Sequence, residues 1–423
     1  MTLIDSTTRH FNSTGPHLPD PDLVHSRKRH LFIDVSVISR EDAGTGIQRV
    51  VRALWSELTG HIWQNVMICP VAATRDRGYV IVSNDFLDRT APADGNSHSA
   101  IDPRAGDLFL GLDLAAHLLP RHDRQIARFK ALGLSVHIIV YDMLPYLHPQ
   151  WFRLRARYNF RRWLRFLDRH ADQLICISQS VAADVDRWIY RRRLLPGRNI
   201  AVSTIRLGSD IAGSMPSKGL PSGIDELRAW MTAGPCIITV GTIEPRKGHD
   251  RILAAFEHLW SGRATMPVRL LVVGRPGWNT AKLQARIKAH SEYGARLRWI
   301  DDASDELLER IYACAGGVMF ASHGEGLGLP LLEAAAHSKP VLVRDLPVYR
   351  ELGLANVRWF TDDYAQALAE TILSWIGDWS DHAPKPQTLP SWQNSADDLI
   401  ARLGLSSERI SRSLSAGTEG ETD

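Results

Sequence analysis

The sequence has 423 residues, of which 44% are hydrophobic and 23% are charged, and its formal net charge is only +3. Such values are ordinary for a globular protein with two domains, and they give no reason to expect nucleic acid as a partner. The four cysteines are widely scattered and no apolar run is long enough to span a bilayer, so we expect neither a disulfide framework nor a membrane-spanning helix.

In chain order, residues 1–28 are polar and rich in proline, and we expect a disordered tail there. Strand and helix patterns then alternate through residues 29–210, which predicts an α/β domain with a parallel sheet covered by helices on both faces. The expected strands are 31–36, 66–71, 79–83, 107–113, 135–141 and 174–178. The expected helices follow a glycine loop at 44–46 and cover 122–132, 151–166 and 181–190.

Glycine, proline and serine cluster in residues 211–232, where we place an interdomain linker. The alternation resumes through residues 233–385, which predicts a second α/β domain. Its expected strands are 236–241, 268–274, 297–300, 317–320 and 340–343, and its expected helices include 250–260, 279–290, 306–314 and 363–376. A last helix is expected within residues 386–404, and a polar tail over residues 405–423.

The most informative stretch begins at the apolar run 317–320, which leads through a glycine-rich turn into a helix. Gly326 and Gly328 allow tight backbone angles, and Pro330 suits the first helical position. The helix start directs unpaired N–H groups at any ligand above it, which favours a diphosphate. Glu325 in the turn and Glu333 in the helix can each accept paired hydrogen bonds from a sugar or ribose diol. The pattern indicates a nucleotide sugar; the alternative is a strand–turn–helix with surface glutamates.

These two glutamates, with seven residues between them, closely resemble the donor-site motif of retaining glycosyltransferases of the GT-B fold, in particular glycosyltransferase family four. Residues 240–249, VGTIEPRKGH, resemble the other signature of this family. The resemblance implies two Rossmann-like domains that face a central crevice and a C-terminal helix that crosses back to the first domain. It also implies that the first domain binds the acceptor and the second binds the nucleotide sugar.

Arg246 and Lys247 follow Gly241 at the end of a strand, where open α/β sheets bind ligands. Two cations there can hold a diphosphate and stabilise its charge as it leaves, and the resemblance assigns them this role. The alternative is a solvated pair of cations at a helix start. That end of a helix carries partial positive charge, which is unfavourable for arginine and lysine.

By resemblance, Glu325 steadies the positive charge on the donor sugar and Glu333 binds the ribose hydroxyls. Main-chain N–H groups of the turn would donate hydrogen bonds to phosphate oxygens. The residues that provide these N–H groups are Gly326, Leu327, Gly328 and Leu329. No Asp-x-Asp-like pair stands at a strand end, so we expect no metal and no other cofactor.

In the first domain, the place of the family's N-terminal glycine loop is taken by Gly44, Gly46, Gln48 and Arg49. The loop would face the crevice between donor and acceptor, and a plain glycine turn is the alternative. A dinucleotide-binding loop is not favoured, because the G-x-G-x-x-G spacing is missing.

Asp142 ends a strand and is a candidate catalytic residue. Many relatives have histidine before this aspartate, whereas this chain has Tyr141, and an aspartate at such a place also caps helices. Ser178 matches a family position at the mouth of the crevice, and capping of the following helix is its alternative role.

The helix expected over 151–166 interleaves aromatic and basic side chains, among them Arg161, Arg162 and Arg165. Such a helix can lie on an anionic membrane surface and approach a lipid-linked acceptor. The alternatives are a core-facing helix with a solvated basic side, or an RNA-binding helix, although no RNA-binding module signature is present.

The DxGTGIQRV start and the YDMLP segment resemble bacterial mannosyl- and rhamnosyltransferases that build O-antigen or capsule. We therefore expect a retaining, metal-independent hexosyltransferase that uses GDP-mannose, or next a rhamnosyl donor, and a lipid-linked glycan acceptor. The sequence has no signal-peptide pattern, and we expect its cysteines to be reduced core thiols. We therefore expect the protein in the cytoplasm, peripheral at the inner face of the plasma membrane. The alternatives are another GT-B enzyme, such as a soluble-acceptor synthase or a nucleotide-sugar epimerase, and a non-catalytic nucleotide-sugar-binding protein.

Overall fold

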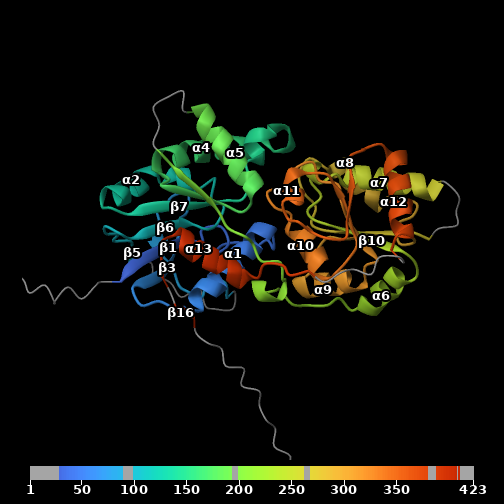
Figure 1. The fold of residues 1–423 in the computed structure, drawn as a ribbon, viewed down its shortest axis with the longest axis horizontal. Coiled ribbons are helices and arrows are strands. Elements are labelled where there is room, and N and C mark those ends of the chain that lie inside the picture. The colour runs from blue at the N-terminus through green and yellow to red at the C-terminus, as the bar shows by residue number, and fades with distance from the viewer. Residues whose placement is uncertain are drawn as a thin grey trace, which may run out of the picture.

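The computed structural model describes residues 28–88, 99–192, 199–261, 267–379 and 387–406, and the backbone of residues 408–409. These residues form two α/β domains that lie side by side (Figure 1). The two tails predicted at residues 1–28 and 405–423 fall almost wholly outside the described residues.

The first domain is built on an eight-stranded sheet in the order β5-β4-β3-β1-β6-β7-β8-β9. Pairing is parallel from β3 to β9, and β4 and β5 add an antiparallel edge. The inner strands are continuous apolar runs because helices cover both of their faces. The strands are β1 (Arg29–Asp34), β3 (Val66–Ala72), β4 (Val80–Ile81), β5 (Ser99–Ala100), β6 (Leu108–Gly111), β7 (Ser135–Val140), β8 (Gln173–Cys176) and β9 (Ala201–Thr204).

The helices of the first domain alternate with its strands along the chain, as predicted. They are α1 (Gly46–Thr59), α2 (Asp123–Ala131), α3 (Leu144–Leu147), α4 (Leu154–His170) and α5 (Gln179–Arg192). Helix α1 starts with a capping box, in which the Thr45 hydroxyl accepts from the Gln48 backbone and the Gln48 side chain accepts from the Thr45 backbone. This cap fixes the direction in which α1 leaves the glycine loop.

The second domain has a fully parallel six-stranded sheet in the order β12-β11-β10-β13-β14-β15. Successive residues of β10 alternate between two cores, since Cys236 and Ile238 pack on one side and Ile237 on the other. The strands are β10 (Cys236–Val240), β11 (Arg269–Val273), β12 (Leu297–Ile300), β13 (Gly317–Phe320), β14 (Val341–Arg344) and β15 (Val357–Phe360).

Helices cover the two faces of this sheet separately. One face carries α6 (Ile224–Thr232), α9 (Asp305–Cys314), α10 (Leu329–Ala336) and α11 (Pro347–Arg350). The other carries α7 (His249–Ser261), α8 (Ala281–Lys288) and α12 (Ala365–Gly377). Helix α6 corrects the prediction of a linker over residues 211–232, because Leu227, Trp230 and Met231 pack in the core of the second domain.

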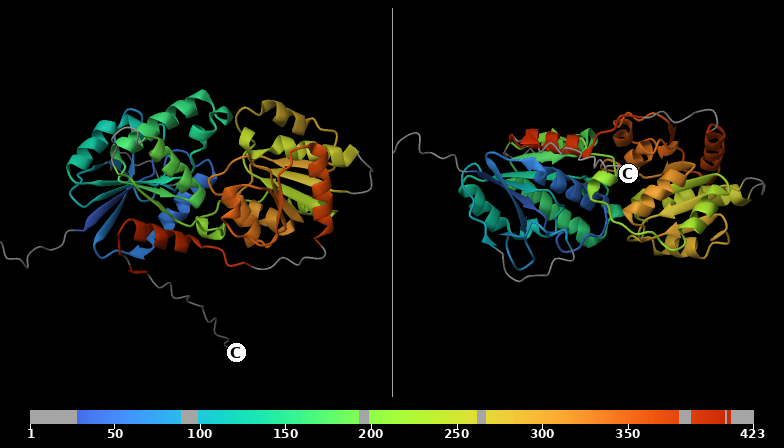
Figure 2. Two further views of the ribbon diagram at one scale, coloured as in Figure 1. Left: turned by 45° about the horizontal axis from the view of Figure 1, so that its top comes forward. Right: turned by 90° about the horizontal axis from the view of Figure 1, so that it is seen from below.

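Helix α13 (Trp392–Arg402) returns to the first domain, as the resemblance implied, and Figures 1 and 2 show it lying along that domain. It packs against α1, and Trp392 is buried in the core of the first domain. The Trp392 Nε1 donates to the Asp210 carbonyl at 2.7 Å. A short antiparallel pair of β2 (His61–Ile62) and β16 (Glu408–Arg409) follows. The core of the first domain is therefore completed by residues from far along the chain.

Candidate functional site

The loops that follow the parallel strands of the two sheets meet between the domains. The turn after β13 lies against the ends of β7 and β8, since the Ser178 Oγ donates to the Gly326 carbonyl at 2.7 Å. A Cβ atom at Gly326 would come within 1.9 Å of the Tyr141 carbonyl oxygen, so only glycine fits there. The glycine-rich turn is thus pressed directly onto the first domain.

The same turn forms the start of α10. Gly328 has a φ of 98° and is the N-cap, and no side chain caps the helix. Leu329 is the first helical residue and Pro330 the second, one position later than predicted. Pro330 has no N–H group and the Leu331 N–H donates to the Gly328 carbonyl at 2.9 Å, so the N–H groups of the turn and of Leu329 are the ones that can bind an anion.

Arg246 and Lys247 lie against Glu325, although their positions in the sequence differ from it by 79 and 78. The Arg246 Nη1 and the Lys247 Nζ each donate to the Glu325 carboxylate at 2.6 Å, and the Arg246 Nη2 lies 2.7 Å from Glu244. Burial opposes ionisation of Glu325, but these two cations outweigh it and lower its pKa to about 2. Glu325 is a carboxylate at any physiological pH, and a diphosphate would compete with it for the cations.

Asp142 and Glu244 are two further acids near Arg246. Burial raises the pKa of both above the usual range, in spite of the nearby Arg246. The Asp142 Oδ1 accepts from the Leu144 backbone at 2.9 Å, so Asp142 forms an Asx turn immediately before α3. The Ser178 Oγ, which donates to the Gly326 carbonyl, also accepts from the Val181 backbone at 3.1 Å. A catalytic role for Asp142 stays a prediction.

Glu333 lies on α10 and is 2% exposed. Its carboxylate accepts from the Tyr312 hydroxyl at 2.9 Å and from the Arg49 guanidinium. Arg49 belongs to α1 of the first domain, so this ion pair joins the two domains. A ribose hydroxyl can contact Glu333 only if the Arg49 side chain moves or shares the carboxylate.

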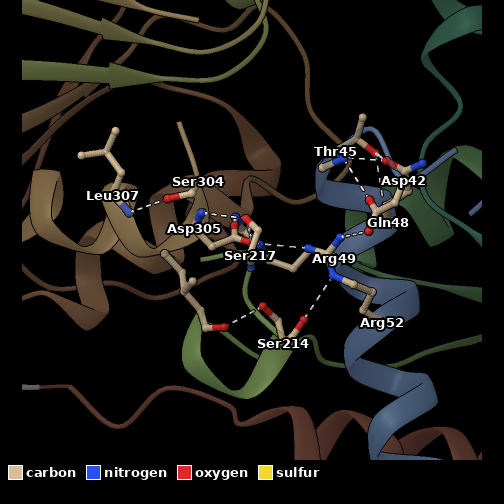
Figure 3. Close-up of polar contacts among 12 residues, drawn as sticks. Asp42, Thr45, Gln48, Arg49, Arg52, Ser214, Ser217, Ser304, Asp305 and Leu307 are labelled. Carbon is tan, nitrogen blue, oxygen red and sulfur yellow. Dashed lines mark hydrogen bonds and ion pairs between the residues drawn. The ribbon is translucent and has the colours of Figure 1, made fainter. Parts of the chain in front are cut away.

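Arg49 also pairs with Asp305 at the start of α9, and Figure 3 shows this contact with its surroundings. The Asp305 Oδ2 accepts from the Ser217 backbone at 2.8 Å and lies 3.5 Å from Arg52. Burial alone would raise the pKa of Asp305, but the Arg49 guanidinium and Ser217 hold it below its usual value. Asp42 completes the network through Arg52 at 2.5 Å. Two arginines of α1 thus bind acids of the second domain and of the glycine loop.

The predicted glycine-loop residues have separate positions. A Cβ at Gly46 would lie 3.5 Å from Leu329, so the loop touches the start of α10, whereas Gly44 is exposed and has a φ of 62°. The Gln48 side chain turns back and donates to the Glu41 carbonyl at 2.6 Å. Only Gly46 and Arg49 of this set reach the second domain; Gln48 shapes the loop.

Helix α4 carries the three predicted surface arginines, of which Arg161 and Arg165 are exposed. Arg162 is half-buried, and its Nη2 donates to the Pro120 carbonyl at 3.5 Å, so a membrane role for the three arginines stays a prediction. Leu154 and Tyr158 are 77% and 62% exposed on the same helix. The helix therefore has a packed side and a basic side that also presents two apolar groups.

The described residues contain no group of three or more His, Cys, Asp or Glu side chains that could hold a metal ion. The prediction that the chemistry needs no divalent cation stays a prediction. All four cysteines are free thiols, as expected, and three of them are buried. In the part of the chain that the structure covers, no helix is both long and apolar enough to cross a bilayer.

Sequence comparison matches residues 229–387 to the family described as "Glycosyl transferases group 1". The serotype-specific mannosyltransferase WbdA of Escherichia coli is 37% identical over 386 residues, which are 90% of this chain but 47% of that relative. The chain thus spans about half the length of these curated relatives. The O-antigen chain mannosyltransferase B of Escherichia coli is 27% identical over 51% of this chain and 53% of its own length.

Solved structures share the whole two-domain arrangement. HepE of Anabaena in complex with UDP and glucose has a TM-score of 0.58 at 16% identity, over 89% of this chain and 95% of its own. A sucrose-phosphate synthase of Thermosynechococcus elongatus has a TM-score of 0.58 at 16% identity, over 88% and 94%. These similarities confirm the GT-B fold predicted from the sequence.

Proposed function

We propose, from the match of residues 229–387 to the group 1 glycosyl transferases, that this chain moves a hexosyl unit from a nucleotide-diphosphate sugar to a glycan. One observation carries the proposal. Arg246 and Lys247 converge on Glu325 at 2.6 Å, beside the uncapped start of α10 and within the matched segment.

In this proposal the two cations and the main-chain N–H groups of the glycine-rich turn and of Leu329 hold the diphosphate. They stabilise the negative charge that develops as the bond to the sugar breaks. Glu325, which keeps its negative charge, faces the opposite charge that develops on the sugar ring. Glu333 receives the ribose hydroxyls once Arg49 has shifted. The cations, the N–H groups and Glu325 then interact more strongly with the transition state than with the bound donor, whereas Glu333 contributes to donor binding.

We propose a retaining reaction, in which the acceptor hydroxyl enters from the face that the diphosphate leaves. The acceptor oxygen bonds to the sugar carbon as the carbon–diphosphate bond breaks, and the departing phosphate oxygen takes the acceptor proton. The anomeric configuration of the product, read by NMR, tests this point directly. We also propose that no divalent cation is needed, because arginine, lysine and a helix start already supply positive charge; full activity in excess chelator is the expected result.

GDP-mannose is the proposed donor and a lipid-linked glycan the proposed acceptor. The names of the Escherichia coli relatives, which are mannosyltransferases of O-antigen synthesis, support this choice. The exposed Arg161 and Arg165, with Leu154 and Tyr158 beside them, suit contact with an anionic membrane, where such an acceptor would lie. Binding to vesicles of anionic phospholipid should fall when Arg161 and Arg165 are changed to Glu, and remain when the exposed Arg228 and Lys282 are changed instead.

A panel of nucleotide sugars, with released nucleotide and transferred sugar measured separately, tests the function. We expect turnover of GDP-mannose, and its loss in the double variant Arg246→Ala, Lys247→Ala. The matched control is Arg228→Ala, Lys282→Ala, which removes two exposed cations of the same domain. Turnover that survives loss of Arg246 and Lys247 would refute the proposal. Binding of the donor without turnover would favour a non-catalytic binding protein, and transfer only to soluble acceptors or interconversion of the donor would favour another GT-B enzyme.

A further inference from the structure

A cavity of about 440 Å³ opens between the domains, apart from the cluster around Glu325. The first domain contributes half of its lining and the second domain the other half. The lining residues are Ala43, Thr45, Phe152, Arg153 and Ala156 of the first domain, and Thr242, Arg275, Pro276, Gly277 and Trp278 of the second. None of them is an acid or a histidine, so the cavity is built to bind rather than to move protons. Its volume is within the usual range for a site that holds a small organic group.

Two aromatic rings stand in this lining. Phe152, which precedes α4, and Trp278, which follows β11, have ring centroids 6.0 Å apart with an interplanar angle of 30°. The Trp278 Nε1 donates to the Trp151 carbonyl at 2.8 Å, which fixes the indole plane across the domain boundary. An aromatic face carries partial negative charge and attracts the slightly positive C–H groups on one face of a pyranose ring.

The floor of the cavity is held rigidly. The Ile243 backbone donates to the Arg275 carbonyl at 2.9 Å, and the Gly277 backbone donates to the Ile243 carbonyl at 3.1 Å. The Thr280 hydroxyl donates to the same Ile243 carbonyl at 2.7 Å. The segments after β10 and β11 are therefore locked together, and a site built on them is preorganised.

The cavity adjoins the proposed diphosphate site on one side. Thr242 follows Gly241, and a Cβ at Gly241 would lie 3.5 Å from the Lys247 Nζ. Trp151, which holds Trp278, also touches the glycine-rich turn, because a Cβ at Gly324 would lie 3.0 Å from its ring. A group in the cavity would thus lie next to the reacting end of a donor held by Lys247.

The proposed ribose contact lies elsewhere along the crevice. Thr45, at the start of α1, lines the cavity, whereas Arg49 of the same helix contacts Glu333 and Asp305. Four residues of α-helix advance about 6 Å along the helix axis. The cavity and the ribose contact therefore occupy different positions along α1, with the start of α10 touching Gly46 between them.

From this arrangement we infer that the cavity binds the terminal pyranose ring of the acceptor glycan, stacked on Trp278 and Phe152. The inference rests on the proposed function and names the place where that function receives its acceptor. Trp278 and Phe152 are then specificity-determining residues contributed by both domains, and the acceptor site is complete only when the domains are together.

The test uses the full chain with GDP-mannose as donor and octyl α-mannobioside as the acceptor probe. Trp278→Ala and Phe152→Ala should each raise the KM for the probe about tenfold or more, since loss of a buried aromatic anchor usually has effects of that size. The affinity for GDP, measured by calorimetry, should be unchanged. Trp278→Phe keeps a stacking ring and should retain most of the affinity for the probe. Tyr364→Ala, which removes an aromatic ring that is 80% exposed in the same domain, is the control and should change neither value.

Direct binding of the probe to the wild-type protein and to Trp278→Ala, followed by ligand-observed NMR, makes the test independent of turnover. An unchanged KM and unchanged binding in Trp278→Ala would overturn the inference. So would lack of probe binding by the wild-type protein, or a loss of GDP affinity in Trp278→Ala, which would assign the cavity to the nucleobase. Failure of the proposed function looks different, because the wild-type protein would then bind no nucleotide sugar or turn none over.

Discussion

The contact between Arg49 and the two acids of the second domain gives the most demanding prediction. Arg49 is 9% exposed, and its partners Glu333 and Asp305 are 2% and 8% exposed. In Arg49→Ala, Glu333 loses its cation and Asp305 is left with the more distant Arg52, at 3.5 Å, while both carboxylates stay out of solvent. Breaking a buried pair from one side costs about 3–5 kcal/mol, because an uncompensated charge is left behind.

An exposed ion pair provides the matched control. Arg206 pairs with Asp398 at 2.9 Å, but its side chain is 67% exposed. Pairs of this kind contribute about 0–1 kcal/mol to the free energy of unfolding. Arg206→Ala removes the same side chain as Arg49→Ala, so the difference between the two variants isolates the effect of burial.

Two measurements follow the consequence of Arg49→Ala at pH 7. Calorimetry should show a lower Tm than for Arg206→Ala, and small-angle scattering should show a larger radius of gyration, because the interface can open to let water reach Glu333 and Asp305. Adding Glu333→Gln and Asp305→Asn to Arg49→Ala should restore the wild-type values, since neutral amides carry no charge to solvate. Equal behaviour of Arg49→Ala and Arg206→Ala in both measurements would refute the reasoning.

Three further predictions follow from the cluster beside the glycine-rich turn. Gly326→Ala places a Cβ within 1.9 Å of the Tyr141 carbonyl and should lower turnover at least about tenfold by displacing the turn, whereas Gly223→Ala, where nothing lies within 4 Å, should not. Glu325→Gln should lower kcat about a hundredfold, because it removes a group that stabilises charge in the transition state. It should not weaken GDP binding measured by calorimetry, because Arg246 and Lys247 lose a partner that competes with the diphosphate. Weaker GDP binding would contradict this reasoning. Burial lowers the pKa of His249 to about 3 in the folded protein, whereas the pKa of histidine in an unfolded chain is about 6.5. Between these two pH values the unfolded chain binds a proton at His249 that the folded protein does not. The free energy of unfolding should therefore fall by up to about 1.4 kcal/mol for each pH unit from 6.5 down to 3. His249→Leu should remove that slope from urea unfolding curves, and His258→Leu, exposed on the same helix, should leave it in place.

The sequence was sufficient for the fold because the pattern and the motifs agree. Buried strands such as Cys236–Val240 are mostly apolar, and the turn and helix around Pro330 carry glycines and two glutamates at a recognisable spacing. The position of Arg246 and Lys247 beside Glu325 follows from two strand ends that neighbour each other in a parallel sheet. These are local or topological facts, and they can be read from one chain.

Contacts across the crevice could not be read in the same way. Asp305 follows a capping serine and looks like an ordinary first-turn acid, and nothing near it indicates that Arg49 is its partner. Trp278 stands in a loop with no motif around it. Helix α6 did leave a signal, because Leu227, Trp230 and Met231 have the i, i+3, i+4 spacing of a buried helix face, but the glycines and prolines before it dominated the composition.

The return of α13 has a consequence for how the protein is made. From the end of β9 at Thr204 to the end of α13 at Arg402, the ribosome must add 402 − 204 = 198 residues. At about 5–20 residues per second, synthesis of that segment takes roughly 10–40 s. During this interval the nascent first domain has the strands of its eight-stranded sheet but lacks the Trp392 side chain, which is buried in its core. Completion of the eight-stranded sheet therefore leaves part of this core uncovered until α13 has been synthesised.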